Sequence, residues 1–156
     1  KYTTSAVCMF RITNLEAIND TYSRKLGNQV IIDVSEFIGD NISNDYIFIR
    51  YMGPKFVIVF SGVDIESVTT FVTDMKNGAE NLEISLPVNK DVEEVEIEAV
   101  DRKKKKKKEE KPQIVKAKLN FVLTTYYKGT GMEEVLKKLE QYIDNADKNE
   151  NDITFI

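Results

Sequence analysis

The chain has 156 residues, of which 42% are hydrophobic and 31% are charged, a composition typical of one ordinary globular domain. Its net charge of −4 argues against a specific nucleic-acid partner, because such binding draws its affinity from a surplus of Lys and Arg. The absence of His excludes histidine acid–base catalysis and histidine metal sites.

The single cysteine and the lack of a long apolar run bear on the cellular location of the chain. Cys8 lies in the apolar run 6–10, which predicts a buried thiol, and one cysteine cannot form a disulfide within the chain. There is no apolar run of about 18 residues, so no transmembrane helix is predicted. We expect a cytoplasmic domain cut from a longer protein, which other parts of that protein could tether to a membrane.

The first predicted elements are a strand and two helices. Residues 2–12 become apolar and predict a central strand. Thr13 and Glu16 have the spacing of a capping box, which predicts a short helix that Gly27 ends. A second helix is expected over about 28–41, because its apolar residues repeat on one face.

A hairpin and a third helix come next. Residues 45–51 and 55–60 predict two strands joined by a turn at 52–54. Asp64 is in position to cap the third helix, and a short strand is expected near 82–86.

The remaining elements complete an alternating pattern. A strand is expected over 117–126, and Thr130 and Glu133 have a second capping-box spacing that opens a helix to about Ala146. Residues 152–156 close the chain as a strand. The order predicts an α/β (α+β) fold with a central, roughly five-stranded mixed sheet flanked by helices.

Residues 88–114 form a charged insert within a single domain that covers residues 1–156. Six acids and no base occur over 91–101, and seven consecutive bases occupy 102–108. The eight bases and eight acids of 91–111 cancel, which favours a solvated hairpin extension or loop. A lysine-rich patch for anionic lipid or nucleic acid is the alternative interpretation.

Three short segments carry a resemblance to a known family. Residues 18–22 read Ile-Asn-Asp-Thr-Tyr, residues 26–28 read Leu-Gly-Asn, and the predicted hairpin contains Arg-Tyr-Met-Gly-Pro-Lys-Phe at 50–56. With the order of elements, this resembles the GGDEF family over nearly all of residues 5–156 apart from the insert. The resemblance implies a nucleotidyl-cyclase-like fold and, for active members, Mg²⁺-dependent synthesis of cyclic di-GMP from GTP.

The resemblance places substitutions at most of the catalytic positions. It puts the family's first metal-binding Asp on Arg11 and a backbone metal contact on Ile12. It puts the metal-binding carboxylate of the hairpin on Pro54 and the next signature acid on Lys55. The phosphate-contacting Lys of the last helix falls on Asp147.

Vestiges of nucleotide recognition are also implied. The guanine-recognising Asn falls on Asn19 and is retained, whereas the Asp that assists it falls on Asn28. The first signature glycine is replaced by Met52, and the second is retained as Gly53. The product-inhibition motif falls on 43–46 and is absent.

These substitutions predict that the domain has lost its Mg²⁺ and needs no cofactor. Magnesium takes oxygen ligands, whereas Arg11 and Lys55 carry only donors and Pro54 has no side-chain ligand. Positive charges beside the site also repel a divalent cation. We therefore expect a non-catalytic signalling or regulatory domain of a larger bacterial protein.

Two other functions stay open at this point. Arg11 and Lys55 could hold phosphate directly, which would make a metal-free sensor that binds GTP weakly, and a residual diguanylate cyclase is the third hypothesis. The simplest expectation is that both side chains are solvated charges at an unused cleft. Expected partners are neighbouring domains of the same chain and a second copy or an active GGDEF protein, but no specific nucleic acid.

Overall fold

The computed structural model describes residues 4–87, 113–146 and 153–156. The predictions for most of the insert, and the position of Asp147, therefore lie outside the described residues. The elements in chain order are β1 (Thr4–Ile12), α1 (Leu15–Thr21), α2 (Arg24–Asn41), β2 (Ile47–Met52), β3 (Lys55–Phe60), α3 (Ile65–Asn81), β4 (Leu119–Tyr127), α6 (Met132–Asn145) and β5 (Ile153–Phe155).

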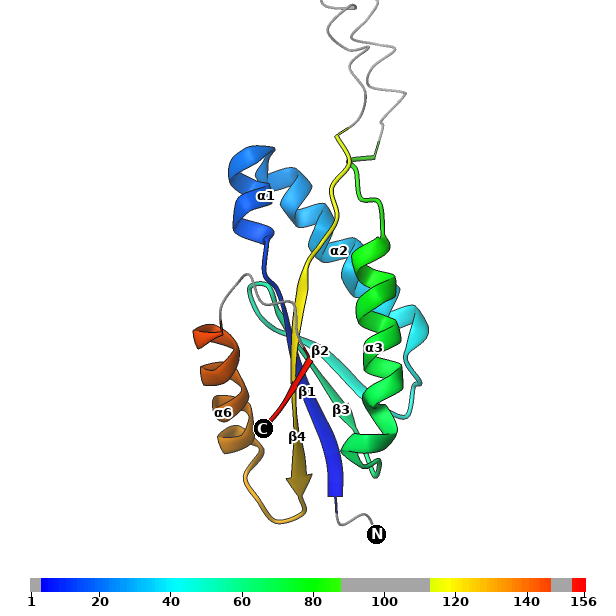
Figure 1. Ribbon diagram of the computed structural model, residues 1–156, viewed down its shortest axis with the longest axis vertical. Helices are drawn as coiled ribbons and strands as arrows, with labels where there is room; N and C mark the ends of the chain where they lie inside the picture. The colour runs from blue at the N-terminus through cyan, green and yellow to red at the C-terminus, as the bar shows by residue number, and fades with distance from the viewer. Residues whose placement is uncertain (1–3, 88–112, 147–152) are drawn as a thin grey trace, which may run out of the picture.

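The strands form one mixed sheet in the order β2-β3-β1-β4-β5, which confirms the predicted five-stranded architecture. The pairings among β1 to β4 are antiparallel, and β5 runs parallel to β4. Helices α2 and α3 cover one face of the sheet, with α1 near the end of β1, whereas α6 lies on the other face (Figure 1). The central strand is β1, so both helical layers pack on it.

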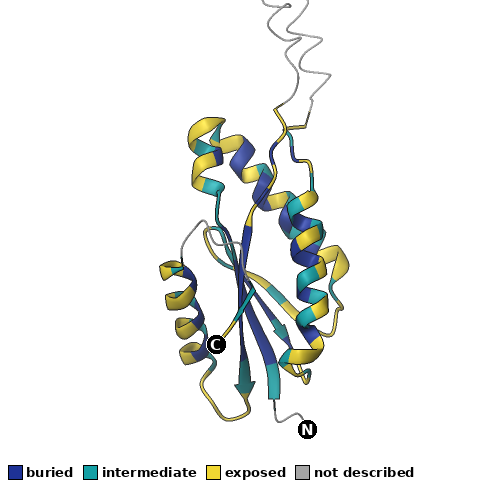
Figure 2. Ribbon diagram, in the orientation of Figure 1, coloured by how far each residue is buried: buried dark blue, intermediate teal, exposed yellow. Residues whose placement is uncertain are grey.

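The two faces of β1 carry different side chains because successive residues of a strand point to opposite sides. Cys8 and Phe10 belong to the larger core under α2 and α3, whereas Val7 and Met9 belong to the smaller core under α6. Buried residues accordingly concentrate on the strands and on the inward sides of the helices (Figure 2). Burial of Cys8 confirms the predicted core thiol and raises its pKa well above the usual range.

Helix α2 begins earlier than the sequence suggested. The Ser23 hydroxyl accepts a hydrogen bond from the Leu26 amide at 3.1 Å, which caps the helix at Arg24. Gly27 therefore lies inside α2, and the prediction that it ends a helix was wrong. A Cβ at this position would clash with the Asn19 side-chain oxygen, so the glycine leaves room for this α1 side chain against α2.

Neither predicted capping box forms. The Thr13 hydroxyl donates to the carbonyl of Lys118 at 3.3 Å, because the segment leading into β4 passes beside the start of α1. Helix α6 begins after Gly131 without a side-chain cap, although Thr130 precedes it. Both sites have the sequence pattern, but the N-cap residues are Asn14 and Gly131, and neither helix has a side-chain cap.

Two further expectations concern α3 and the segment after it. The Asp64 carboxylate accepts a hydrogen bond from the Ser67 amide at 2.8 Å, which confirms the predicted cap and lowers the pKa of Asp64. The strand predicted near 82–86 is reduced to one bridge, in which Ile84 and Val115 exchange backbone hydrogen bonds at 2.9 Å. This bridge joins the two chain segments that lead to and from the insert.

Candidate functional site

The pairing of β1 with β3 brings together three positions that the resemblance assigns to catalysis. Arg11 lies directly opposite Lys55 in the register, and both side chains are on the α6 face. The Ile12 amide donates a hydrogen bond to the carbonyl of Pro54 at 3.0 Å, which fastens the hairpin turn to the end of β1. The structure thus confirms that the turn at 52–54 lies beside the end of the first strand.

The hairpin turn keeps its shape without any carboxylate. Gly53 has a φ of +57°, a left-handed conformation that glycine adopts without steric cost. Its carbonyl accepts a hydrogen bond from the Arg50 Nε at 2.9 Å, and the register shifts between Arg50 and Met52. Met52, which the resemblance places at a signature glycine, is 64% exposed. The turn therefore presents an apolar side chain where the resemblance implies access to the backbone.

Two carboxylates of α6, which the sequence analysis did not single out, hold Lys55. The Lys55 ammonium lies 2.8 Å from Glu140 Oε2, and 3.0 and 3.2 Å from the two carboxylate oxygens of Asp144. Glu140 and Asp144 are four residues apart, so they lie on the same side of α6, next to the buried residues Leu139 and Ile143. The sequence signal that could have identified them is the pair of acids four residues apart, next to the apolar residues of the helix.

Arg11 is bound more loosely. Its guanidinium Nη1 lies 3.9 Å from the nearest Asp144 oxygen, which is an ion pair but not a hydrogen bond. Its Nε is buried and has no hydrogen-bond partner within the described part of the chain. With 19% of its side chain exposed, Arg11 is held at the site with unused donors.

The environment keeps Lys55 charged. Burial by itself lowers the pKa of this ammonium, but the hydrogen bonds and negative charges of Glu140 and Asp144 outweigh it and raise the pKa above its ordinary value. Only 13% of the Lys55 side chain is exposed. The expectation that Arg11 and Lys55 are simply solvated charges was therefore wrong: both are ion-paired to a helix.

The arrangement reverses the charges that the resemblance implies for this cleft. Here the strands carry the cations and the helix carries the carboxylates. The resemblance implies carboxylates at the strand positions and a lysine on the last helix. The Lys55 ammonium fills the position between Glu140 and Asp144 where a cation would bind, so these residues do not fit Mg²⁺. Within the described ranges, Asp, Glu and Cys side chains form no group of three or more suited to a metal ion.

The predicted base-recognition residues lie elsewhere, at the junction of α1 and α2. The Asn19 side-chain oxygen is buried against Gly27 and has no hydrogen-bond partner. Asn28 lies one residue further along α2 and is exposed. Among the described residues, no hydrogen bond or ion pair links Asn19 to Arg11 or Lys55.

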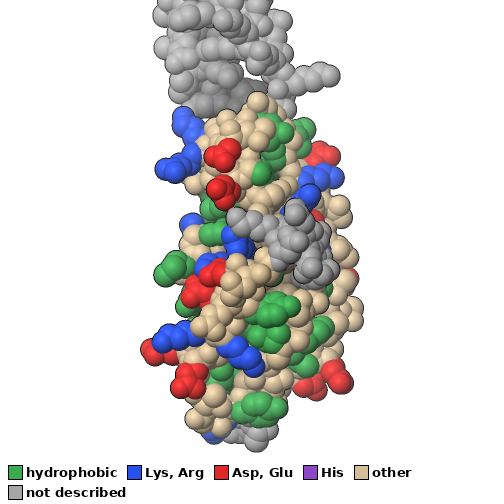
Figure 3. Space-filling model, turned by 60° about the vertical axis from the view of Figure 1, so that its left-hand side comes forward, with side chains coloured by type: hydrophobic (Ala, Val, Ile, Leu, Met, Phe, Trp, Pro, Cys, Tyr) green, Lys and Arg blue, Asp and Glu red, His purple; other side chains and the backbone are tan. Residues whose placement is uncertain are grey.

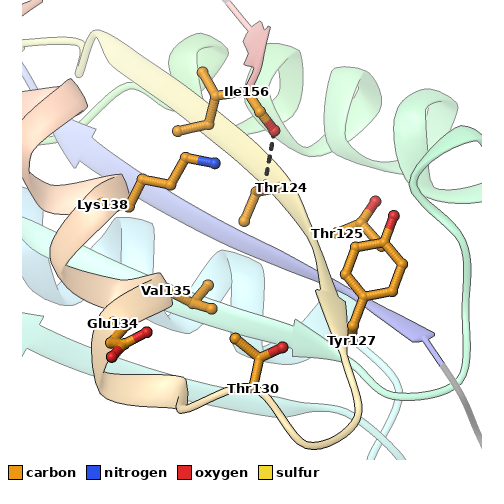
Figure 4. Close-up of a pocket in the computed structure, with 8 residues that line it drawn as sticks. All are labelled: Thr124, Thr125, Tyr127, Thr130, Glu134, Val135, Lys138 and Ile156. Carbon is orange, nitrogen blue, oxygen red and sulfur yellow. Dashed lines mark hydrogen bonds between the residues drawn. The ribbon is translucent and has the colours of Figure 1, made fainter.

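A separate cavity of about 430 Å³ lies at the other end of α6, beside the end of β4 (Figure 4). The Thr124 hydroxyl donates to the carbonyl of Ile156 at 2.8 Å at its edge. None of the residues that the sequence analysis singled out as site residues lines it. Its lining consists of Thr124, Thr125, Tyr127, Thr130, Glu134, Val135, Lys138 and Ile156.

Charges on the α6 side of the molecule are mixed rather than of one sign. Figure 3 brings this side forward and shows Lys and Arg side chains interspersed with Asp and Glu. Among the residues that the structure describes, this side therefore presents no extended basic field of the kind that attracts nucleic acid.

The sheet order, the helical layers and the hairpin against β1 define a GGDEF-like α+β domain, and comparisons with known proteins agree. The family model described as "Diguanylate cyclase, GGDEF domain" matches residues 1–99. The chain belongs to the GGDEF family. An uncharacterized membrane protein of Staphylococcus aureus (strain USA300) is 26% identical over 87 residues, which are 56% of this chain and 24% of that protein. The chain thus spans about a quarter of the length of the curated relatives it matches.

Solved structures show the same fold at low sequence identity. The GGDEF domain of DgcB from Caulobacter crescentus, in complex with c-di-GMP, matches with a TM-score of 0.74 at 16% identity, covering 98% of this chain and 78% of that one. The diguanylate cyclase SiaD from Pseudomonas aeruginosa, in complex with its activator SiaC, matches with a TM-score of 0.74 at 10% identity, covering 99% and 50%. In the part of the present chain that the structure describes, no helix has the length and apolar character to cross a bilayer.

Proposed function

We propose that this chain is a non-catalytic GGDEF domain that acts as a signalling or regulatory module of a larger bacterial protein. The observation that carries the proposal is the ion pairing of Lys55 with Glu140 and Asp144. The hairpin position that normally supplies an acid here supplies a cation, and that cation is already neutralised within the domain.

The physical argument concerns charge and ligands together. Joining two GTP molecules requires cations that neutralise the phosphates and activate a hydroxyl, which in this family are metal ions held by carboxylates. Arg11 and Pro54 supply no carboxylate at the end of β1 or in the hairpin turn. The carboxylates of α6 face Lys55, so a divalent ion would have to displace an ammonium at 2.8 Å.

A regulatory role suits what the chain resembles. The curated relatives are about four times as long as the matched region and are named membrane proteins, which supports a cytoplasmic domain tethered through other segments. SiaD is seen with an activator protein, which supports regulation of this fold through protein contacts. We propose neighbouring domains, a second copy or an active GGDEF protein as the partners.

The alternative of a metal-free GTP sensor rests on Asn19, the retained base-recognition residue. Its side-chain oxygen is unpaired, but it is buried against Gly27 and must rotate outward before any base could reach it. Lys55, the proposed phosphate contact, is occupied by two carboxylates. Both observations favour the non-catalytic module over the sensor.

The direct test is incubation of the purified chain with GTP and Mg²⁺ or Mn²⁺, followed by chromatographic detection of cyclic di-GMP, with an active diguanylate cyclase as positive control. We expect no product. Reversion of Arg11→Asp alone should not restore activity, because Pro54 still lacks a carboxylate and Lys55 remains. Measurable product from the unmodified chain would refute the proposal.

Calorimetric titration with GTP separates the sensor from the inert domain. Binding that persists in EDTA and is lost in Arg11→Ala would establish the sensor, whereas metal-dependent binding would restore the cyclase hypothesis.

A further inference from the structure

The Arg11–Lys55 pair has more hydrogen-bonding capacity than the structure uses. The Arg11 Nε is buried without a partner, and its Nη1 lies 3.9 Å from Asp144, beyond hydrogen-bond distance. A guanidinium and an ammonium carry donors only, so Arg11 can be satisfied only by further acceptors. A buried donor without a protein partner is uncommon in a folded protein, and this donor is available to a further acceptor.

The geometry of the pair suits an anion. Arg11 and Lys55 are direct cross-strand neighbours, and like charges in this arrangement repel unless an anion lies between them or beside them. A planar guanidinium next to an ammonium is a combination that binds phosphate through charge-assisted hydrogen bonds. In this structure the anions are supplied by the protein itself, as Glu140 and Asp144 of α6.

We propose that Arg11 and Lys55 form a metal-free site for phosphate or pyrophosphate groups, and that Glu140 and Asp144 mask it as internal competitors. The inference deepens the proposed function and rests on it, because it takes the same cleft to have no metal ion. It adds that Glu140 and Asp144 keep phosphate out of the cleft, whereas Arg11 and Lys55 are still able to bind phosphate.

The test is titration of the chain with pyrophosphate in EDTA, at low salt, for the unmodified protein and for the double variant Glu140→Gln/Asp144→Asn. Removing both carboxylates frees Lys55 and Arg11, and we expect pyrophosphate to bind the double variant at least about tenfold more tightly. Adding Lys55→Met or Arg11→Met to the double variant should remove this gain. The gain should be equal for GTP, because the cluster contacts no base.

The matched control is Glu133→Gln/Glu134→Gln, which makes the same change in net charge on the same helix but at its first turn. Thermal melting of each variant checks folding, and the single variants Glu140→Gln and Asp144→Asn provide intermediate cases. The proposal is overturned if the control tightens binding equally, if neither carboxylate variant tightens it, or if a gain appears for GTP alone. Since no metal or turnover enters this assay, its failure leaves the cyclase test of the proposed function intact.

Discussion

Two adjacent rows of residues cross the three central strands of this sheet, and they contrast sharply. In the first, Phe56, Phe10 and Phe121 are register neighbours on the face under α2 and α3. In the second, Lys55, Arg11 and Asn120 are register neighbours on the face under α6. One residue step along each strand separates a wholly apolar row from a polar one.

The difference shows which part of the domain is stabilised by close packing and which part carries the charges of the cleft. The ring of Phe10 is fully buried and stacks on Phe56 and Phe121 at centroid distances of 4.8 and 4.9 Å. Changing such a row disturbs several close contacts at once. The polar row lies at the partly exposed end of the smaller core, where a change of charge can be offset by a change on α6. The fold therefore depends more on the apolar row than on the charges of the cleft.

The largest effect should follow from breaking the apolar row. Phe10→Ala removes a ring between two others, and we expect it to lower the free energy of unfolding by about 3–5 kcal/mol, measured by urea denaturation. Tyr127→Ala, at an exposed position of β4, is the control and should change it little. Similar losses in both variants would show that the stacked row is not the stability centre.

A smaller loss should follow from Gly27→Ala. The new Cβ would overlap the Asn19 side-chain oxygen, so that side chain must rotate or α1 must move, and we expect a loss of about 1–3 kcal/mol in unfolding free energy. Combining it with Asn19→Gly should recover part of the loss, which a double-mutant cycle measures. Gly39→Ala in the same helix, with 3.9 Å to the nearest atom, should be neutral or stabilising. No coupling between positions 19 and 27 would contradict the packing role.

Breaking the polar row should have a still smaller effect. Lys55→Met leaves Glu140 and Asp144 without their closest cation, and we expect a loss of about 1 kcal/mol, between that of exposed and buried ion pairs. Lys137→Met, on the exposed side of α6, is the control. Because the folded-state pKa of Lys55 is raised, its contribution is complete below about pH 10.4, the ordinary lysine value, and declines as pH rises through the folded pKa. A difference between wild type and Lys55→Met that grows at alkaline pH would contradict the pairing.

The smallest effect is expected for the insert. Replacing residues 91–111 with a short Gly-Ser linker should shift the melting temperature little, because a segment so rich in charge has few side chains that can join an apolar core. Ile84 and Val115, which form a β-bridge, lie outside the replaced segment. A drop of several degrees in calorimetry would show that the insert contributes to the packed domain.

The sequence by itself determined the features that depend on local pattern. Alternation and apolar runs predicted β1 and the β2–β3 hairpin, and the Asp64 cap predicted the start of α3. The motifs around Asn19 and Gly53 carried the family, because short signatures occupy fixed positions in the fold. The same residue-by-residue comparison located Arg11, Pro54 and Lys55, and the strand register then brought them together.

Tertiary structure decided the features that depend on how distant segments dock. Thr13 donates its hydroxyl to a backbone carbonyl 105 residues away, and Gly27 leaves room for the Asn19 side chain of α1; the local sequence pattern contains neither contact. The partners of Lys55 lie 85 and 89 residues away, and they meet it only because Val135, Leu139 and Ile143 seat α6 on β1 and β4. Sequence periodicity predicts which side of a helix is buried. Packing sets the position of that helix along the sheet, and this position decides which charged residues face each other.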